Sequence, residues 1–257
     1  MRLTLVTSPR PAPVEFAQLL RRKATDHGCT VVEPGAPADI VVAIGGDGTV
    51  LEAACTALEQ SIPLIGFNLG TIGFLAEAEP DQLDETLARL VSGQYRLEER
   101  LTVTAVLDNG RETTGLNDVV IEKIDSQRLV VLAVEVDGES FLTHRADGVV
   151  IATSTGSSAY AFSAGGPLVH PQIDALLFVP VAPHSLFNRT LMLPPASKIR
   201  VTVADDRPVR VSVDGREIGT LEEGGVVEIH RGPHPVRFIR FDHEGFPARV
   251  TRKFDLR

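Results

Sequence analysis

The hydrophobic pattern changes its period near residue 95, and this change constrains the fold more than any other feature of the chain. Before it, short apolar runs rich in β-branched residues alternate with helix-length segments, which is typical of a parallel sheet covered by helices on both faces. After it, apolar residues recur at every second position between turn signals, which predicts antiparallel hairpins. The sequence therefore predicts an α/β N-terminal domain with a parallel, Rossmann-like sheet, followed by a mainly β C-terminal domain.

Individual elements follow from the same two periods. In the first part we expect strands at 3–6, 30–32, 40–44 and 63–67, and helices at 14–27, about 49–58 and 80–92. In the second part we expect strands at 101–107, 149–152 and 198–203, and turns at 108–110, 137–138 and 214–215. We place the first domain at residues 1–95 and the second at 96–244. The tail, about residues 245–257, could return to the first domain.

Composition excludes several classes of protein. The chain is 43% hydrophobic and 23% charged, which is enough to bury a core. No apolar stretch approaches the roughly 20 residues of a membrane helix. The net charge of -9 argues against broad nucleic-acid binding, although backbone amides and a few arginines can still bind a small anion. Two cysteines are too few for a disulfide framework, and the first residues enter a strand pattern rather than a signal peptide, so we expect a cytoplasmic protein.

A glycine-rich segment, Gly45-Gly46-Asp47-Gly48-Thr49, joins the strand at 40–44 to the next helix. Glycines let backbone amides approach a ligand, and a helix start adds unpaired N–H donors that favour phosphate. Because phosphate repels a carboxylate, Asp47 suggests a specific role: it could accept a proton from a hydroxyl or hold a divalent cation. The alternative is a tight turn in which Asp47 and Thr49 cap the helix. The segment is neither a Walker loop nor GxGxxG.

A second glycine-rich segment, residues 66–75, follows the next predicted strand and contains Asn68, Gly70 and Gly73. In a parallel sheet both segments lie at the carboxyl ends of strands, where ligands bind in such folds. Ordinary turn chemistry is the alternative for this loop.

Small and hydroxyl side chains mark a third region, residues 145–167 in the β-rich part. Such residues suit close approach to a polar ligand, although Ser157 could simply cap a short helix. Asp147 could pair with Arg145 on the surface, or could accept hydrogen bonds from ribose hydroxyls or an amide in a pocket. Upstream, Asn117-Asp118 could form an Asx turn or reach ribose hydroxyls. The seven histidines give no convincing metal site.

Together these segments resemble the NAD kinase family, whose members phosphorylate NAD to NADP with ATP or polyphosphate. The matching motifs, in family order, are residues 45–49, 68–75, 117–118, 147–167, 183–186 and 213–215. The first motif is shared with lipid kinases and, loosely, with phosphofructokinases, whereas the run from 147 to 167 is much more specific.

The resemblance implies transfer of the γ-phosphoryl group of ATP or polyphosphate to the 2′-hydroxyl of the adenosine ribose, with Mg²⁺ or Mn²⁺, and it implies that Asp47 accepts the hydroxyl proton. The first domain then binds the phosphate donor and the second binds the dinucleotide. Asn117 and Asp118 would hold the adenine-side ribose and the base region, and Asp147 the nicotinamide end. The residues implied to contact NAD are Asp47, Gly48, Asn117, Asp118, Arg128, Arg145, Asp147, Thr155, Ser158, Ala159, Tyr160 and Ser163.

The donor phosphates are assigned to Gly45, Gly46, Gly48 and Thr49 and to the second loop through Asn68, Gly70 and Gly73. No protein ligand for the metal is assigned. The family also implies a homodimer or homotetramer. From the net charge and the lack of a long apolar stretch we expect neither nucleic acid nor a membrane as a partner.

The chain departs from the family pattern at three positions. Asp118 stands where the family usually has Glu, Ser154 replaces the usual Pro, and Arg216 stands where many bacterial members carry Gln. None of these changes removes the implied proton acceptor. Two other functions stay open at this point: a lipid or sphingoid kinase with the same first loop, and a non-catalytic dinucleotide sensor.

Overall fold

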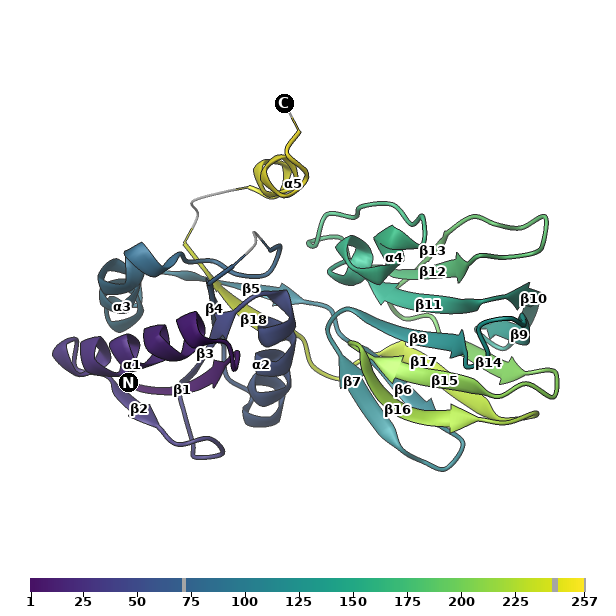
Figure 1. Ribbon diagram of the computed structural model, residues 1–257, viewed down its shortest axis with the longest axis horizontal. Coiled ribbons are helices and arrows are strands. Elements are labelled where there is room, and N and C mark those ends of the chain that lie inside the picture. The colour runs from purple at the N-terminus through teal and green to yellow at the C-terminus, as the bar shows by residue number, and fades with distance from the viewer. Residues whose placement is uncertain (71–72, 242–244, 257) are drawn as a thin grey trace. The chain divides into compact units, whose positions relative to one another are not determined.

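The computed structural model describes residues 1–70, 73–241 and 245–256 (Figure 1). The chain divides into two compact units, the first made of Met1–Glu99 and Val236–Arg257 and the second of Arg100–Pro235. The range 96–244 given above for the second domain thus includes strand β18 (Val236–Arg240), which lies in the sheet of the first unit because it pairs with β4 (Leu64–Asn68). Residues 242–244 and 257 of the expected domain and tail lie outside the described residues.

The first unit is built on one sheet with the strand order β2-β1-β3-β4-β18-β5. The four strand pairs from β2 to β18 are parallel, which confirms the predicted sheet. The remaining bounds are β1 (Arg2–Thr7), β2 (Thr30–Val32), β3 (Ile40–Gly45) and β5 (Arg96–Arg100). The helices are α1 (Pro11–Asp26), α2 (Asp47–Gln60), η1 (Pro80–Gln82, a 3-10 helix), α3 (Leu83–Ser92) and α5 (Phe246–Phe254).

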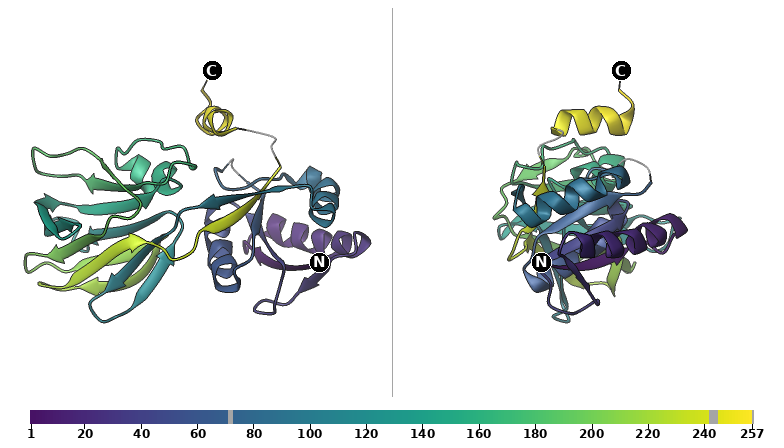
Figure 2. Two further views of the ribbon diagram at one scale, coloured as in Figure 1. Left: turned by 180° about the vertical axis from the view of Figure 1, so that it is seen from behind. Right: turned by 90° about the vertical axis from the view of Figure 1, so that its left-hand side faces the viewer.

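Strand β3 is buried along its whole length because helices cover both faces of the sheet. Its alternate residues Ile40, Val42 and Ile44 pack into the same apolar cluster as side chains of α1 and α3. Figures 1 and 2 show α2 on the opposite face, where Val50, Ala53 and Ala57 are its buried residues. This helix starts two residues earlier than expected, at Asp47, since Gly46 is extended and serves as its N-cap.

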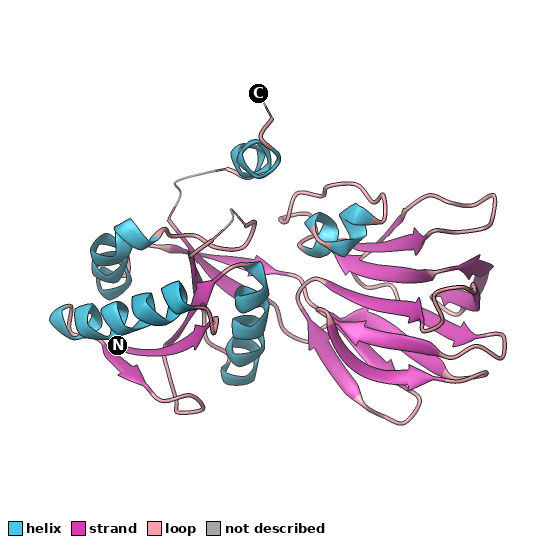
Figure 3. Cartoon of the chain, in the orientation of Figure 1, coloured by secondary structure: helices cyan, strands magenta, loops and turns pink. Residues whose placement is uncertain are grey.

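The second unit consists almost entirely of strands (Figure 3). They form two six-stranded sheets, β10-β9-β14-β17-β6-β7 and β13-β12-β11-β8-β15-β16, which share one large core of buried Val, Ile and Leu. All described pairs in both sheets are antiparallel. The mainly β domain is therefore confirmed.

The strand bounds of this unit are β6 (Val103–Leu107), β7 (Glu112–Gly115), β8 (Asp118–Lys123), β9 (Val130–Val136), β10 (Glu139–Ala146), β11 (Gly148–Thr153), β12 (Leu176–Val181), β13 (Leu191–Leu193), β14 (Ile199–Val203), β15 (Val209–Val213), β16 (Arg216–Leu221) and β17 (Val226–Arg231). The expected turns join β6 to β7, β9 to β10 and β15 to β16. At the last two, both residues of the Asp-Gly pair have positive φ, 53° and 84° at 137–138 and 48° and 74° at 214–215, as a type I′ hairpin turn requires.

A short helical segment, η2 (Gly156–Ser158) with α4 (Tyr160–Ser163), covers the outer face of the sheet that contains β8 and β11. Ala161 and Val169 pack there against Val120 of β8 and Val150 of β11. Side chains alternate along a strand, so Asp118 is on the same outer face as Val120, while Val119 enters the core between the sheets.

Candidate active site

The two glycine-rich segments of the first unit lie side by side at the carboxyl edge of the sheet. Gly45 at the end of β3 is paired with Asn68 at the end of β4, and the Leu69 amide donates a hydrogen bond of 3.1 Å to the Gly45 carbonyl. The expected adjacency of these segments is confirmed. A Cβ at Gly45 would lie 2.4 Å from Thr49 Oγ1, so the start of α2 packs too closely on this residue to admit a side chain.

Asp47 reaches from the first residue of α2 to the second glycine-rich segment. Its Oδ2 accepts a hydrogen bond of 3.0 Å from the Phe74 amide, and its Oδ1 accepts one of 3.1 Å from the Leu75 amide. These bonds fix the carboxylate across the gap between the segments. The two oxygens retain further lone pairs, since an ionised carboxylate has about four acceptor positions, so Asp47 can still accept a hydrogen bond from a hydroxyl.

Position 73 has no room for a side chain, for a reason that the sequence did not reveal. A Cβ there would lie 2.1 Å from Asp47 Oδ1 and 2.7 Å from Asp47 Cγ. By contrast, a Cβ at Gly46, Gly48 or Gly70 would meet no atom within 4 Å. Those three positions therefore leave open space beside the backbone. Thr71 and Ile72 of the same segment lie outside the described residues.

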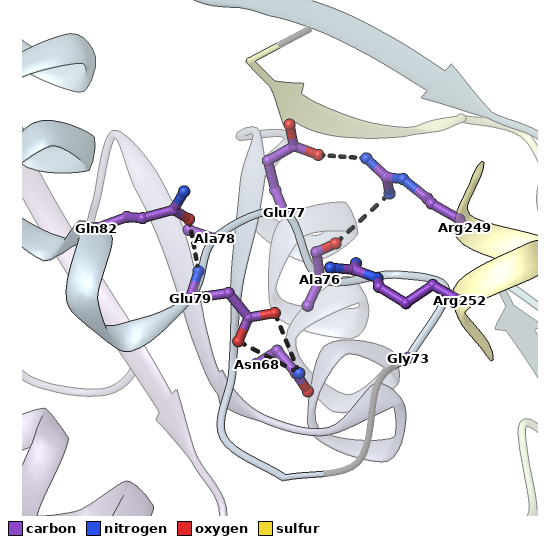
Figure 4. A pocket seen from close by; sticks show the side chains of 9 residues that line it. All are labelled: Asn68, Gly73, Ala76, Glu77, Ala78, Glu79, Gln82, Arg249 and Arg252. Atoms are coloured by element: carbon purple, nitrogen blue, oxygen red, sulfur yellow. Dashed lines mark hydrogen bonds and ion pairs between the residues drawn. The ribbon is translucent and has the colours of Figure 1, made fainter. Parts of the chain in front are cut away.

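A pocket of about 260 Å³ is lined in part by Gly73 and Asn68 (Figure 4). Asn68 is only 7% exposed, and its Nδ2 donates to the two carboxylate oxygens of Glu79 at 3.4 and 3.5 Å. The Asn68 Oδ1 is buried with no hydrogen-bond partner among the described residues. Arg249 and Arg252 of α5 line the opposite wall, and the sequence analysis did not identify either of them.

In the second unit, the candidate pair Asn117-Asp118 is held by a carboxylate distant in sequence. Asp214, in the hairpin turn after β15, accepts hydrogen bonds from the amides of Leu116 and Asn117 at 2.7 Å each and of Asp118 at 3.2 Å. A Cβ at Gly156 would lie 2.1 Å from the Asn117 carbonyl oxygen, so η2 packs directly on this turn. The structure brings Asn117, Asp118 and the start of η2 together. Asn117 Oδ1 is buried with no partner among the described residues.

Asp118 is 4% exposed, and its pKa is raised to about 7, first by burial and then by the nearby charge of Asp214. The pKa of Tyr160 is also raised, first by burial and then by the charges of Glu122, Asp147 and Asp118. Asp118 and α4, which begins with Tyr160, share the outer face of the sheet. The candidate residues Asp118 and Tyr160 therefore lie on one face of the sheet, and Asp147 lies beside Lys123 at the other end of β8.

Asp147 forms its ion pair with Lys123 rather than with Arg145. The distance between Lys123 Nζ and Asp147 Oδ1 is 2.5 Å, and the same ammonium donates to the Ser126 carbonyl at 2.9 Å. Arg145 is exposed, and Arg128 lies in an exposed loop with its Nε 3.9 Å from Asp125.

The remaining candidates differ in what they contact. Thr155 is buried and accepts a hydrogen bond of 3.3 Å from Arg100, which is also buried. Ser158 is half-buried and donates to the Thr155 carbonyl at 3.3 Å, whereas Ser163 is exposed. Ser157 donates to the Ser154 carbonyl at 2.7 Å and accepts from the Val169 amide at 3.0 Å, so it holds η2 to the following loop.

The raised pKa of Asp118 predicts a specific dependence of stability on pH. The folded state binds this proton more tightly than the unfolded chain does, so the contribution is full below the ordinary carboxyl pKa near 3.9 and is lost as pH rises through about 7. We expect Asp118→Asn to gain stability relative to the parent over that window, by up to roughly 4 kcal/mol at about 1.4 kcal/mol per tenfold change in proton affinity. Urea unfolding at pH 5 and pH 8 measures the difference. A difference that does not grow with pH would contradict the prediction.

Two family models match the chain. Residues 13–95 match the ATP-NAD kinase N-terminal domain and residues 116–241 match the ATP-NAD kinase C-terminal domain. An NAD kinase of Rhodococcus erythropolis is 46% identical over 236 residues, which is 88% of this chain and 75% of that protein. An NAD kinase of Nocardia farcinica is 45% identical over 235 residues, covering 88% and 72% of the two chains.

Solved structures agree on the fold. The chain superposes on a yeast NADH kinase complexed with NADH with a TM-score of 0.86 and 24% identity, over 100% of this chain and 88% of that one. It superposes on an Archaeoglobus fulgidus NAD kinase in complex with ATP with a TM-score of 0.79 and 24% identity, over 100% and 97%. The chain thus has the same fold as these two structures. The chain belongs to the NAD kinase family, and the lipid kinase alternative is rejected.

Proposed function

We propose that Asp47 takes the proton from the 2′-hydroxyl of the adenosine ribose of NAD while the γ-phosphoryl group of ATP is transferred to that oxygen, which yields NADP. The observation that carries this proposal is the double hydrogen bond from Phe74 and Leu75 to the Asp47 carboxylate. A neutral hydroxyl is a poor nucleophile, and a carboxylate held in a fixed direction can act as its general base, an effect worth about 10²–10⁴-fold in rate.

The phosphates of the donor are proposed to lie against Gly45, Gly46, Gly48 and Thr49. Open space at Gly46 and Gly48 lets phosphate oxygens approach the backbone amides, and the N-terminus of α2 adds a partial positive charge. The second segment, through Asn68, Gly70 and Gly73, would border the same donor.

The dinucleotide is proposed to lie along the outer face of the second unit. Asp118 at the start of β8 would hold the adenine-side ribose together with Asn117, and Asp147, beyond the far end of β8, would hold the nicotinamide end. The five residue steps from Asp118 to Lys123, the ion-pair partner of Asp147, span roughly 16 Å along the strand, which suits an extended ligand. Contacts along it are proposed for Arg128, Arg145, Thr155, Ser158, Ala159, Tyr160 and Ser163.

A divalent cation, Mg²⁺ or Mn²⁺, is proposed to arrive with the donor phosphates. Among the described residues there is no cluster of three or more His, Cys, Asp or Glu side chains that could hold a metal ion. When bound, the cation would neutralise charge on the transferred group.

Assembly and location also remain proposals. We infer a homodimer or homotetramer acting in the cytoplasm, with polyphosphate as an alternative donor. In the described part of the chain, no helix is long and apolar enough to cross a membrane.

Incubation of the purified protein with NAD, ATP and Mg²⁺ tests the proposed reaction, with NADP measured by an NADP-specific dehydrogenase. We expect NADP to accumulate and chelation of the divalent cation to stop its formation. A parallel reaction replaces ATP with polyphosphate. If neither donor gives NADP while NAD still binds, the protein is a dinucleotide sensor.

A further inference from the structure

The C-terminal helix α5 contacts the first unit through aromatic rings and a guanidinium group. None of its nine described residues is buried. Its contacts include those of the Phe74 ring, whose centroid lies 6.4 Å from that of Phe246 and 6.1 Å from that of Phe254, and those of the Arg249 guanidinium. The helix therefore contributes little to the apolar core, and the contacts of Phe246, Arg249 and Phe254 reach residues of the second glycine-rich segment.

Arg249 connects this segment to a buried anchor. Its Nη2 lies 2.7 Å from Oε2 of Glu77, a side chain only 2% exposed (Figure 4). Its Nη1 donates to the carbonyls of Phe74 and Ala76 at 3.4 and 3.5 Å. Glu77 itself is held by Arg240 at 3.0 Å and by the Phe241 amide at 2.8 Å. Arg249 thus links two backbone carbonyls to a carboxylate that cannot easily move.

The carbonyls of this stretch of backbone bind the arginines, and two of its amides bind Asp47. Arg240 donates to the Leu75 carbonyl at 3.1 Å, so two guanidiniums bind three successive carbonyls, those of residues 74, 75 and 76. The amides of Phe74 and Leu75 are the groups that donate to the Asp47 carboxylate. If these peptide groups shifted, the amides would turn away from Asp47, and its carboxylate would no longer be held in one orientation.

We propose that Arg249 is a positioning residue for phosphoryl transfer: it holds the Phe74 and Ala76 carbonyls beside Glu77 and so fixes the peptide group that joins Phe74 to Leu75, whose amide orients Asp47. This inference rests on the proposed role of Asp47 as general base. It assigns the C-terminal helix a part in turnover that neither the folding of the core nor the binding of the dinucleotide requires.

The test replaces Arg249 with methionine, which keeps an unbranched apolar stem and removes the guanidinium. We expect kcat to fall about 10–100-fold, since small misplacements of a catalytic group have effects of that size, while KM for NAD stays within about twofold. Arg22→Met is the matched control, because Arg22 is an exposed residue of α1 and its loss changes the charge equally. A kcat within about twofold of the parent, or a change in KM alone, overturns the proposal.

A second arm combines Arg249→Met with Asp47→Asn. If Arg249 acts through Asp47, the residual kcat of the Asp47→Asn enzyme falls by less than about threefold, because there is no general base left to orient. A further tenfold loss shows a separate role and overturns the inference. The two failures are distinguishable: an active Asp47→Asn enzyme rejects the proposed base, whereas a slow Asp47→Asn enzyme with a fast Arg249→Met enzyme rejects only the positioning role.

Discussion

Asp47→Asn is expected to lower kcat by about 10²–10⁴-fold while NAD still binds with near-parental affinity. The amide side chain has nearly the same shape, and its oxygen can still accept a hydrogen bond from the Phe74 or Leu75 amide, but it cannot take a proton from a hydroxyl. Steady-state assays of NADP formation give kcat, and calorimetric titration with NAD gives the affinity.

Asp81→Asn is the control for this variant. Asp81 is an exposed residue in the first turn of η1, so the control removes an acidic group near a helix start of the same unit. We expect the control to retain parental turnover. Near-parental turnover in the Asp47→Asn enzyme would mean that another group receives the proton.

Arg240→Met is expected to destabilise the protein by about 3–5 kcal/mol, the usual cost of removing one member of a buried ion pair. Arg240 is 1% exposed, and its guanidinium lies 3.0 Å from Glu77 Oε2 and 3.1 Å from Glu98 Oε1. Without it, the buried Glu77 carboxylate keeps Arg249 but loses one of its two cationic partners. The free energy of unfolding from urea denaturation measures the loss.

A surface ion pair provides the comparison. In the pair between Arg2 and Asp39 the two side chains are 51% and 44% exposed, and Arg2→Met should therefore cost less than about 1 kcal/mol. If the two arginine variants are equally stable, the buried cluster contributes no more to stability than a solvated pair. Arg240 would then not serve as an anchor for the Leu75 carbonyl.

Local patterns were sufficient for those parts of the fold whose causes are local. The parallel sheet followed from short buried runs such as Ile40–Ile44, and the hairpins from Asp-Gly pairs that accept positive φ. The adjacency of the two glycine-rich segments followed because both end neighbouring parallel strands. The order of the motifs was enough to identify the family.

The site, in contrast, contains features that no local pattern carries. Glycine is needed at 73 because of Asp47, and at 156 because of the Asn117 carbonyl. Asp214 holds the amides of residues 116–118 from almost a hundred positions away. A motif shows that such residues belong together, but only packing shows which atoms they meet.

The return of the chain to the first sheet is the largest feature that only the tertiary structure decided. We predicted no strand at Val236–Arg240, where three successive residues, 238 to 240, are buried, and this segment pairs with Leu64–Asn68 across about 170 positions. The helix that follows has no buried residue among those described, so its apolar pattern could not have predicted where it packs. Hydrophobic periodicity encodes which face of an element is buried, whereas the choice of partner depends on contacts between distant segments that exist only once the chain has folded.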